Sequence, residues 1–294
     1  MLFRIFIPSS LPDFPEIPFP LCIIRARIST SMIQFPNIDP IAVQIGPLAI
    51  RWYGISYLVG IGLAWMLLSW RARSKENWNG DQVADLVVYA ALGAVLGGRL
   101  GYVLLYKLSS YMADPLSIFK VWEGGMSFHG GLIGVLIAFA LFSRKTGKSF
   151  FQIADFTAPV VPVGLFFGRI ANFINGELWG APTDKPWGVV FPGYAAGGVP
   201  RHPSQLYEAA LEGLLLFLIL WFFSRKERPL RAVSGLFLLG YGCFRFLVEF
   251  IREPDAHVGY IAFDWVTLGQ VYSLPMIIIG LILLLLAYRN KEES

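Results

Sequence analysis

About seven apolar runs, each long enough to cross a lipid bilayer, constrain this chain more than any other feature of its sequence. A transmembrane helix needs roughly 20 residues that are mostly apolar. Hydrophobic residues make up 55% of the 294 residues and charged residues only 15%, which argues against a soluble protein. We therefore predict an all-α, polytopic membrane protein whose spans lie near residues 52–70, 84–106, 126–143, 151–175, 205–224, 233–251 and 270–288.

Lysine and arginine are unevenly distributed between the connections, and this indicates how the chain crosses the membrane. Cytoplasmic connections carry an excess of these two residues. The connections after the first, third, fifth and seventh runs contain twelve of them, against six on the other side. We therefore predict an N-terminus outside the cytoplasm and a C-terminus inside it. The net charge of +4 is modest and lies mainly on one side, so nucleic acid is not an expected partner.

The first 31 residues differ in character from the rest of the chain. They contain five prolines and scattered arginines, and they lack the apolar core of about 7–15 residues that a signal peptide needs. We expect residues 1–31 to be a disordered or re-entrant extension, or the product of an upstream start codon, with residues 32–294 as a single membrane domain. The two cysteines, Cys22 and Cys243, have no metal or disulfide spacing, so no metal site is expected.

Two short patterns inside the apolar runs indicate packing and function. Gly93, Gly97 and Gly101 recur every four residues, which lets a second helix approach closely. The stretch 168–180 reads G-R-I-A-N-F-I-N-G-E-L-W-G and places an arginine and two asparagines where lipid is expected. Arg169 and Asn172 share one helical face, and Asn175-Gly176 is a plausible helix stop. An arginine in hydrocarbon costs roughly 2.5–3.5 kcal/mol or more, so a function is the favoured interpretation and an ion pair for packing is the alternative.

Polar groups converge in the outer half of the predicted membrane. In the sixth run, four polar residues spaced at 0, 4, 8 and 11 fall within roughly an 80° arc of one helix. The same depth holds polar groups from the first, second, third, fourth and fifth runs. The polar face of the sixth run consists of Tyr241, Arg245, Glu249 and Arg252, and the others are Tyr53, Arg99, His129, Arg169, Glu208 and Glu212.

The residue types at this depth suit an anionic lipid. Arginine in a low dielectric binds phosphate through paired, charge-assisted hydrogen bonds. On the outer side of a membrane, the available phosphate is a phospholipid head group. His129, on a glycine-flanked turn, is a candidate proton acceptor near neutral pH, and a hydrogen-bonded structural role is its alternative. The motifs H-E-x-x-H, G-x-S-x-G and G-x-x-x-x-G-K-[ST] are absent.

The stretch 168–180 resembles the signature of bacterial prolipoprotein diacylglyceryl transferases, G-R-x-[GA]-N-F-x-N-x-E-x-x-G, at every defined position. The resemblance extends from about Met32 to the C-terminus. It implies a helical body in the bacterial inner membrane with a small periplasmic head, which would be the connection 176–203. Further segments that resemble the family are 52–54, 97–99, 124–131, 201–208 and 240–252.

The resemblance also implies a reaction. The diacylglyceryl group of phosphatidylglycerol moves to the thiol of the lipobox cysteine in a prolipoprotein signal peptide, a thioether forms, and glycerol 1-phosphate leaves. No cofactor is implied, because the phosphate already activates the lipid. His129 matches the family's essential histidine and is interpreted as the base. The remaining roles are head-group binding by Arg169, Asn172, Arg245, Tyr53 and Arg99, catalysis by Arg169, Arg245 and Tyr241, and support by Glu177, Glu249, Arg252 and Gly180.

Two other classes of function stay open at this point. Ionisable residues inside a membrane also line the paths of transporters and channels, although such a path should place polar groups at both depths. Here the inner halves are largely apolar, with Asp85 and Asp155 as the main exceptions. Another enzyme of outer-leaflet phospholipids, such as a hydrolase, would use water in place of the thiol.

Overall fold

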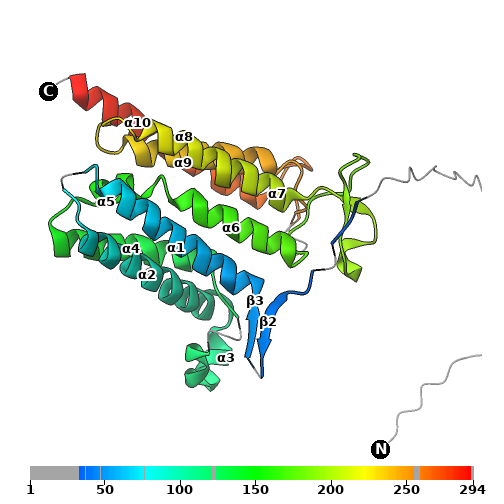
Figure 1. Cartoon of the computed structure of the whole chain (residues 1–294). Coiled ribbons are helices and arrows are strands. Elements are labelled where there is room, and N and C mark those ends of the chain that lie inside the picture. The colour runs from blue at the N-terminus through cyan, green and yellow to red at the C-terminus, as the bar shows by residue number, and fades with distance from the viewer. Residues whose placement is uncertain are drawn as a thin grey trace, which may run out of the picture. The chain divides into compact units, whose positions relative to one another are not determined.

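The structure is a computed structural model, and it describes residues 33–292 apart from residues 37, 47, 76, 121–123 and 255–258. The extension predicted for residues 1–31 therefore lies outside the described residues. Residues 32–294 form one compact unit. Helices dominate this unit, and Figure 1 shows the long ones lying side by side as a bundle.

Helices occupy all seven regions that the sequence predicts to span the membrane. Among the described residues, five helices are long and apolar enough to cross a bilayer, and a sixth span results if the bent pair α5–α6 counts as one. Helix α9 is apolar but has only 17 residues. The polytopic helical architecture is confirmed, and the total of seven spans stays a prediction. The helices are α1 (Trp52–Ala72), α2 (Gly80–Tyr106), α4 (Phe128–Thr146), α5 (Phe150–Thr157), α6 (Val161–Ile174), α7 (Ser204–Glu208), the π-helical η4 (Ala209–Leu215), α8 (Leu216–Phe223), α9 (Ala232–Val248) and α10 (Leu268–Glu292).

Local sequence explains where several helices begin. The side chain of Asn79 accepts a hydrogen bond from the Gln82 amide at the start of α2, and Ser149 forms a capping box with Gln152 at the start of α5. Such caps satisfy amide groups that have no partner within the helix. Proline at the second position of α6 fits a first turn, and α5 and α6 meet at a 51° bend.

Glycines let α2 and α4 pack closely, as the sequence predicts. A Cβ atom on Gly93 would lie 2.6 Å from the carbonyl oxygen of Gly134, and one on Gly101 would lie 2.6 Å from the Cα atom of Gly130. Real Cβ atoms do not approach backbone so closely, so only glycine fits these positions. Without much hydrophobic driving force between helices in lipid, such close packing is a main source of their association.

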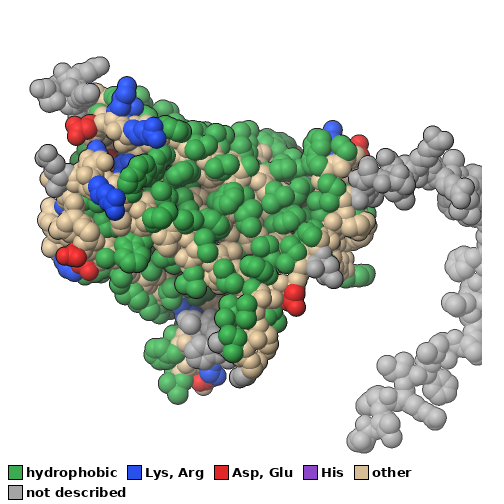
Figure 2. Space-filling view, viewed as in Figure 1, with side chains coloured by type: hydrophobic (Ala, Val, Ile, Leu, Met, Phe, Trp, Pro, Cys, Tyr) green, Lys and Arg blue, Asp and Glu red, His purple; other side chains and the backbone are tan. Residues whose placement is uncertain are grey.

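Apolar side chains cover the sides of the bundle. Figure 2 shows hydrophobic groups over its middle, with lysines and arginines gathered at the end where α10 finishes. Leu58, Leu104 and Leu285 are 71%, 61% and 62% exposed. Soluble proteins rarely expose apolar patches of this extent. The apolar surface therefore supports the assignment of these helices to lipid.

Short strands and helices lie at one end of the bundle. Strands β1 (Ile33–Gln34), β4 (Val189–Val190) and β5 (Pro200–Arg201) form a three-stranded sheet in the order β1-β4-β5. Strands β2 (Ile41–Ile45) and β3 (Leu48–Arg51) form an antiparallel hairpin that leads into α1. Between α2 and α4, the helices α3 (Leu108–Ala113) and η1 (Pro115–Phe119) project from the bundle in Figure 1. The connection 176–203 is thus a small folded head on a helical body.

Candidate active site

Three arginines converge on one buried carboxylate, that of Glu208. Arg169 Nε lies 2.9 Å from Glu208 Oε2. Arg245 Nη1 and Arg252 Nη1 lie 3.0 and 3.1 Å from the other oxygen, Oε1. The side chain of Glu208 is fully buried, whereas the three arginine side chains remain 18%, 15% and 12% exposed. Arg169 and Arg245 therefore contact the same carboxylate from two different helices.

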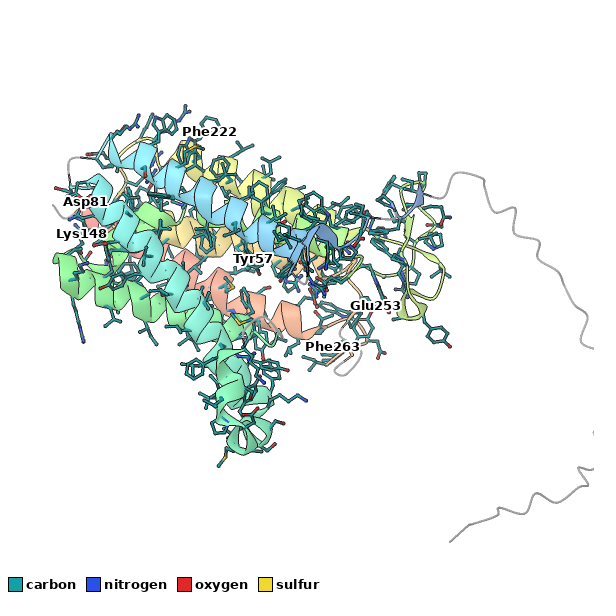
Figure 3. The ribbon with its side chains drawn as sticks, turned by 60° about the horizontal axis from the view of Figure 1, so that its bottom comes forward. Tyr57, Asp81, Lys148, Phe222, Glu253 and Phe263 are labelled. Carbon is teal, nitrogen blue, oxygen red and sulfur yellow. The ribbon has the colours of Figure 1, made fainter. Side chains whose placement is uncertain are left out.

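The positions of these groups follow from helix packing. Arg169 lies near the end of α6, and Arg245 lies near the end of α9. Both helices pack against the α7–η4 segment, where Glu208 is the last residue of α7. Figure 3 places Glu253, which follows Arg252, at the opposite end of the bundle from Asp81 and Lys148. The arginine cluster therefore lies at the end of the bundle that carries the head.

Glu249 supports the cluster from the same helix as Arg245. Its Oε2 atom lies 2.7 Å from Arg245 Nη2, one helical turn away. The hydroxyl of Thr267 donates to Glu249 Oε1 at 2.9 Å. A Cβ atom on Gly269 would lie 2.5 Å from the Glu249 carboxyl carbon, so the start of α10 presses against this side chain. Glu249 is thus an ion-pair partner of Arg245 that is itself held by Thr267 and α10.

A further carboxyl group, that of Glu212, lies one turn beyond Glu208. It is fully buried, and its Oε2 atom lies 3.7 Å from Arg169 Nη2. Neither oxygen of Glu212 has a hydrogen-bond partner among the described residues. The π-helical geometry of η4 surrounds this residue, and Gly213 lies directly against Phe166 of α6. Such segments interrupt α-helices frequently at functional sites.

The signature asparagines bind a glutamate at the end of α6. Asn172 Nδ2 donates to Glu177 Oε1 at 2.8 Å, and Asn175 Nδ2 reaches the same oxygen at 3.3 Å. Helix α6 ends at Ile174, and Gly176 adopts a φ of +66°, in agreement with the predicted helix stop. Glu177 forms no ion pair with an arginine in the described part of the chain. Its contacts fix Asn172 instead.

Two tyrosines border the arginine cluster. Tyr241, on α9, lies within electrostatic range of Glu212, Arg169 and Arg245. Tyr53, at the start of α1, lies within electrostatic range of Arg169 and is 37% exposed. Its hydroxyl lies 3.2 Å from that of Tyr57. Both tyrosines therefore lie close enough to the guanidinium groups to interact with them electrostatically.

His129 lies outside the arginine cluster. It is the second residue of α4 and is exposed, and its ring centroid is 5.4 Å from that of Tyr272 on α10. The imidazole forms no hydrogen bond with the rest of the described chain. Tyr272 is one turn from Gly269, which touches Glu249, so His129 and Glu249 contact neighbouring positions of α10.

Arg99 has a different environment from the other arginines. Its buried guanidinium donates to five backbone carbonyl groups and forms no ion pair with any described carboxylate. An arginine has five N–H donors, so none is left for a ligand. Arg99 therefore fixes the segment that precedes α4 and His129. The accepting carbonyls belong to Ser117, Ile118, Lys120, Gly124 and Gly125.

Gly180 joins the head to the arginine cluster. Its amide donates to the carbonyl of His202 at 2.8 Å, and it forms a β-bridge with Arg252. A Cβ atom on Gly180 would lie 2.5 Å from the carbonyl oxygen of Ile251. Only glycine fits between these backbones. The final glycine of the signature is thus required by the close approach of two chain segments.

His202 forms a polar network in the head. Its Nδ1 atom lies 3.1 Å from the hydroxyl of Tyr207, which also accepts a hydrogen bond from Trp187 Nε1 at 2.8 Å. Partial burial lowers the pKa of His202, and the positive charge of Lys185 lowers it further. The imidazole is therefore neutral at pH 7.

The sequence assigned no role to the two carboxyl groups at the centre of the cluster, Glu208 and Glu212. The available signal was a pair of acids four residues apart inside an apolar run, since such residues are rare in membrane helices and face the bundle interior. Among the described residues, no group of three or more His, Cys, Asp or Glu side chains has the geometry of a metal site.

Comparison with known proteins identifies the family of this chain. The family model for prolipoprotein diacylglyceryl transferase matches residues 40–286. A protein from Oleidesulfovibrio alaskensis is 59% identical over 264 residues, which cover 90% of this chain and 98% of the relative. Proteins from Pseudomonas fluorescens and Coxiella burnetii are 60% and 58% identical, over 90% and 89% of this chain and 98% and 100% of their own lengths. All three are named phosphatidylglycerol–prolipoprotein diacylglyceryl transferase. The chain belongs to the prolipoprotein diacylglyceryl transferase family.

Proposed function

We propose that this protein transfers the diacylglyceryl group of phosphatidylglycerol to the cysteine thiol of prolipoprotein lipoboxes, the first step of lipoprotein maturation. The thiol sulfur forms a bond with the terminal glyceryl carbon, the bond from that carbon to the phosphate oxygen breaks, and glycerol 1-phosphate leaves. The observation that carries the proposal is the convergence of Arg169, Arg245 and Arg252 at the head end of an apolar bundle. Membership of the transferase family supports the same reaction.

Arg169 and Arg245 bind the head-group phosphate in this proposal. The Nη atoms of Arg169 make no hydrogen bond within the described residues, so they are available to phosphoryl oxygens. Arg245 already contacts Glu208 and Glu249, and a bound phosphate would be a further ligand at the outer edge of the same guanidinium group. As sulfur attacks, negative charge grows on the phosphate, and fixed guanidinium groups in a low dielectric stabilise that charge. Asn172, held by Glu177, orients the head group.

His129 takes the thiol proton, because a thiolate is the reactive nucleophile and an unpaired imidazole is a suitable base near neutral pH. The base stands beside Tyr272, one turn of α10 from Gly269, which touches Glu249. Tyr53 from α1 and Tyr241 from α9 position the head group. Arg99 supports the site through the segment before His129.

The remaining acids and glycine hold this arrangement. Glu249 and Glu208 place the guanidinium groups of Arg245 and Arg252, and Gly180 keeps the head against the turn that carries Arg252. Apart from the lipid, the partner is the signal peptide of a prolipoprotein. Its cysteine approaches from the head end of the bundle.

The protein is a multi-pass membrane protein, and we place it in the bacterial inner membrane with the head in the periplasm. The concentration of basic residues at the end opposite the head supports this orientation. The N-terminus is then periplasmic and the C-terminus cytoplasmic. The arginine cluster opens toward the outer leaflet, where phosphatidylglycerol and the lipobox are both accessible.

A transfer assay on purified protein tests the proposal. Phosphatidylglycerol labelled in its glyceryl group is supplied in vesicles with a lipobox peptide, and the products are separated. We expect thioether peptide and glycerol 1-phosphate. Free diacylglycerol without thioether would identify a hydrolase, and lipid or ion movement without turnover would identify a transporter; either result would overturn the proposal.

Variants test the residue roles in the same assay. We expect His129→Ala and Arg245→Lys to lower turnover about 100-fold or more, because lysine lacks the planar pair of donors. Arg73, which is exposed in the turn after α1, provides a matched control as Arg73→Lys and is expected to keep full activity. Full activity in Arg245→Lys, with normal folding, would contradict phosphate binding by this arginine.

A further inference from the structure

Glu212 is the buried acid that the reaction described above leaves without a role. Its carboxyl group is fully buried, and neither oxygen accepts a hydrogen bond from any described residue. Its nearest cation, Arg169 Nη2, lies at 3.7 Å, which is beyond hydrogen-bond distance. An ionised carboxylate in such a place is costly, since nothing replaces the water it has lost.

The neighbouring carboxylate makes ionisation of Glu212 still less favourable. Glu208 lies one turn away on the same segment and takes the direct contacts of all three arginines. When two carboxyl groups share one site, repulsion between them favours a proton on one. The three guanidinium groups stabilise the negative charge of Glu208 more than that of Glu212, so the proton resides on Glu212. The charged and titratable groups that face Glu212 are Arg169 from α6, Glu208 from α7, Tyr241 and Arg245 from α9, and Arg252 from the turn after α9.

The charge of the cluster supports this assignment. Three arginines with Glu208 and Glu249 ionised and Glu212 neutral give a net charge of 3 − 2 = +1. Phosphatidylglycerol brings a single negative charge on its phosphodiester, so the occupied site is then neutral. With Glu212 ionised, the empty cluster would be neutral, and the bound lipid would add an unbalanced charge to a low-dielectric site.

The chemistry of the leaving group supplies a use for this proton. Breaking the carbon–oxygen bond leaves its electron pair on the phosphate, which becomes a monoester that would carry a second negative charge. The second pKa of a phosphate monoester is about 6, so its basicity is suited to accept a proton from a carboxylic acid. A phosphate held by Arg169 would lie beside the guanidinium nitrogen nearest Glu212.

We propose that Glu212 is a general acid that protonates the departing phosphate oxygen. The inference rests on the proposed function. The thiol proton passes to His129, sulfur bonds to the glyceryl carbon, and the electron pair of the broken bond takes the proton of Glu212. Glycerol 1-phosphate leaves as a monoanion, and the proton on His129 returns to Glu212 through solvent. The net change moves one proton from sulfur to phosphate.

The test compares Glu212→Gln with wild type in the labelled-lipid transfer assay, measuring kcat and KM from pH 5 to 9. Glutamine keeps the shape and cannot give up a proton. We expect kcat to fall about 100-fold or more, with KM within about three-fold. Wild-type kcat should fall at high pH, where Glu212 is ionised and has no proton to donate. This fall should be absent from the Glu212→Gln variant. Asp85→Asn, a half-exposed acid paired with Lys145 at the opposite end of the bundle, is the control.

Several outcomes would overturn the assignment. A Glu212→Gln enzyme within three-fold of wild-type kcat would do so, as would a raised KM at unchanged kcat. If the variant does not fold, wild-type enzyme is tested with donor lipids whose head groups lower the second pKa of the leaving phosphate. If Glu212 protonates the leaving phosphate, kcat should be nearly independent of the pKa of that phosphate. A steep dependence of kcat on this pKa would contradict the role of Glu212. If wild type forms no thioether at all, the proposed function fails; thioether formation with an unaffected variant removes only the role of Glu212.

Discussion

Replacing Glu208 tests whether one carboxylate gathers the three arginines. Glu208→Gln keeps the side-chain shape but removes the charge that Arg169, Arg245 and Arg252 share at 2.9, 3.0 and 3.1 Å. Three buried or part-buried guanidinium groups would then repel one another with no common counter-charge. We expect both stability and activity to fall, because the same contact holds the helices and spaces the phosphate ligands.

The magnitude follows from the geometry. Removing one partner of a buried ion pair costs about 3–5 kcal/mol, and effects on residues of one network do not add. Arg245 keeps the ionised Glu249 as a neighbour, which places the loss near the lower end, at about 3 kcal/mol. For a chain of this size, each kcal/mol shifts Tm by about 2–4 °C, so the expected shift is about 6–12 °C.

The assay combines thermal unfolding in detergent with diacylglyceryl transfer. Glu253→Gln is a matched control, because Glu253 pairs with Arg201 at 3.0 Å but is 39% exposed. Exposed pairs contribute about 1 kcal/mol or less, so the control should lose no more than about 4 °C. A Glu208→Gln protein with Tm within 2 °C of wild type and transfer within three-fold would refute the reasoning.

Three other substitutions test single contacts. Arg99→Gln removes donors to the five carbonyls before α4, so faster proteolysis at residues 114–127 and lower transfer are expected, and unchanged cleavage would contradict that anchoring role. Gly180→Ala places a Cβ atom 2.5 Å from the Ile251 carbonyl oxygen and should lower stability by about 1–3 kcal/mol in thermal unfolding; a neutral result would mean that the head shifts freely. His202 has a pKa below its unfolded value, so its contribution to stability is present above the unfolded pKa of about 6.5 and decreases as the pH falls below that value. The difference in Tm between pH 8 and pH 5.5 should therefore be smaller in His202→Gln than in wild type, and an equal difference would exclude this histidine as its source.

The position of each polar group along its helix is the property that the sequence determined most completely. A helix rises by a fixed distance per residue, and a bilayer fixes where each apolar run begins and ends, so the polar groups of separate runs could be placed at one depth. The common level of Arg169 and Arg245 along the bundle, the helix stop at Asn175-Gly176 and the glycine packing of α2 all follow from spacing along single helices. The signature stretch likewise identified the family, and a family model over residues 40–286 confirms it.

Contacts between helices were decided only by the tertiary structure. Depth does not specify how a helix is rotated about its axis or which helices are its neighbours, because these depend on how side chains from distant segments pack together. The sequence therefore did not assign Glu208 as the shared partner of the arginines. It also did not separate Arg99, whose donors all face backbone carbonyls, from the arginines that remain available to a phosphate.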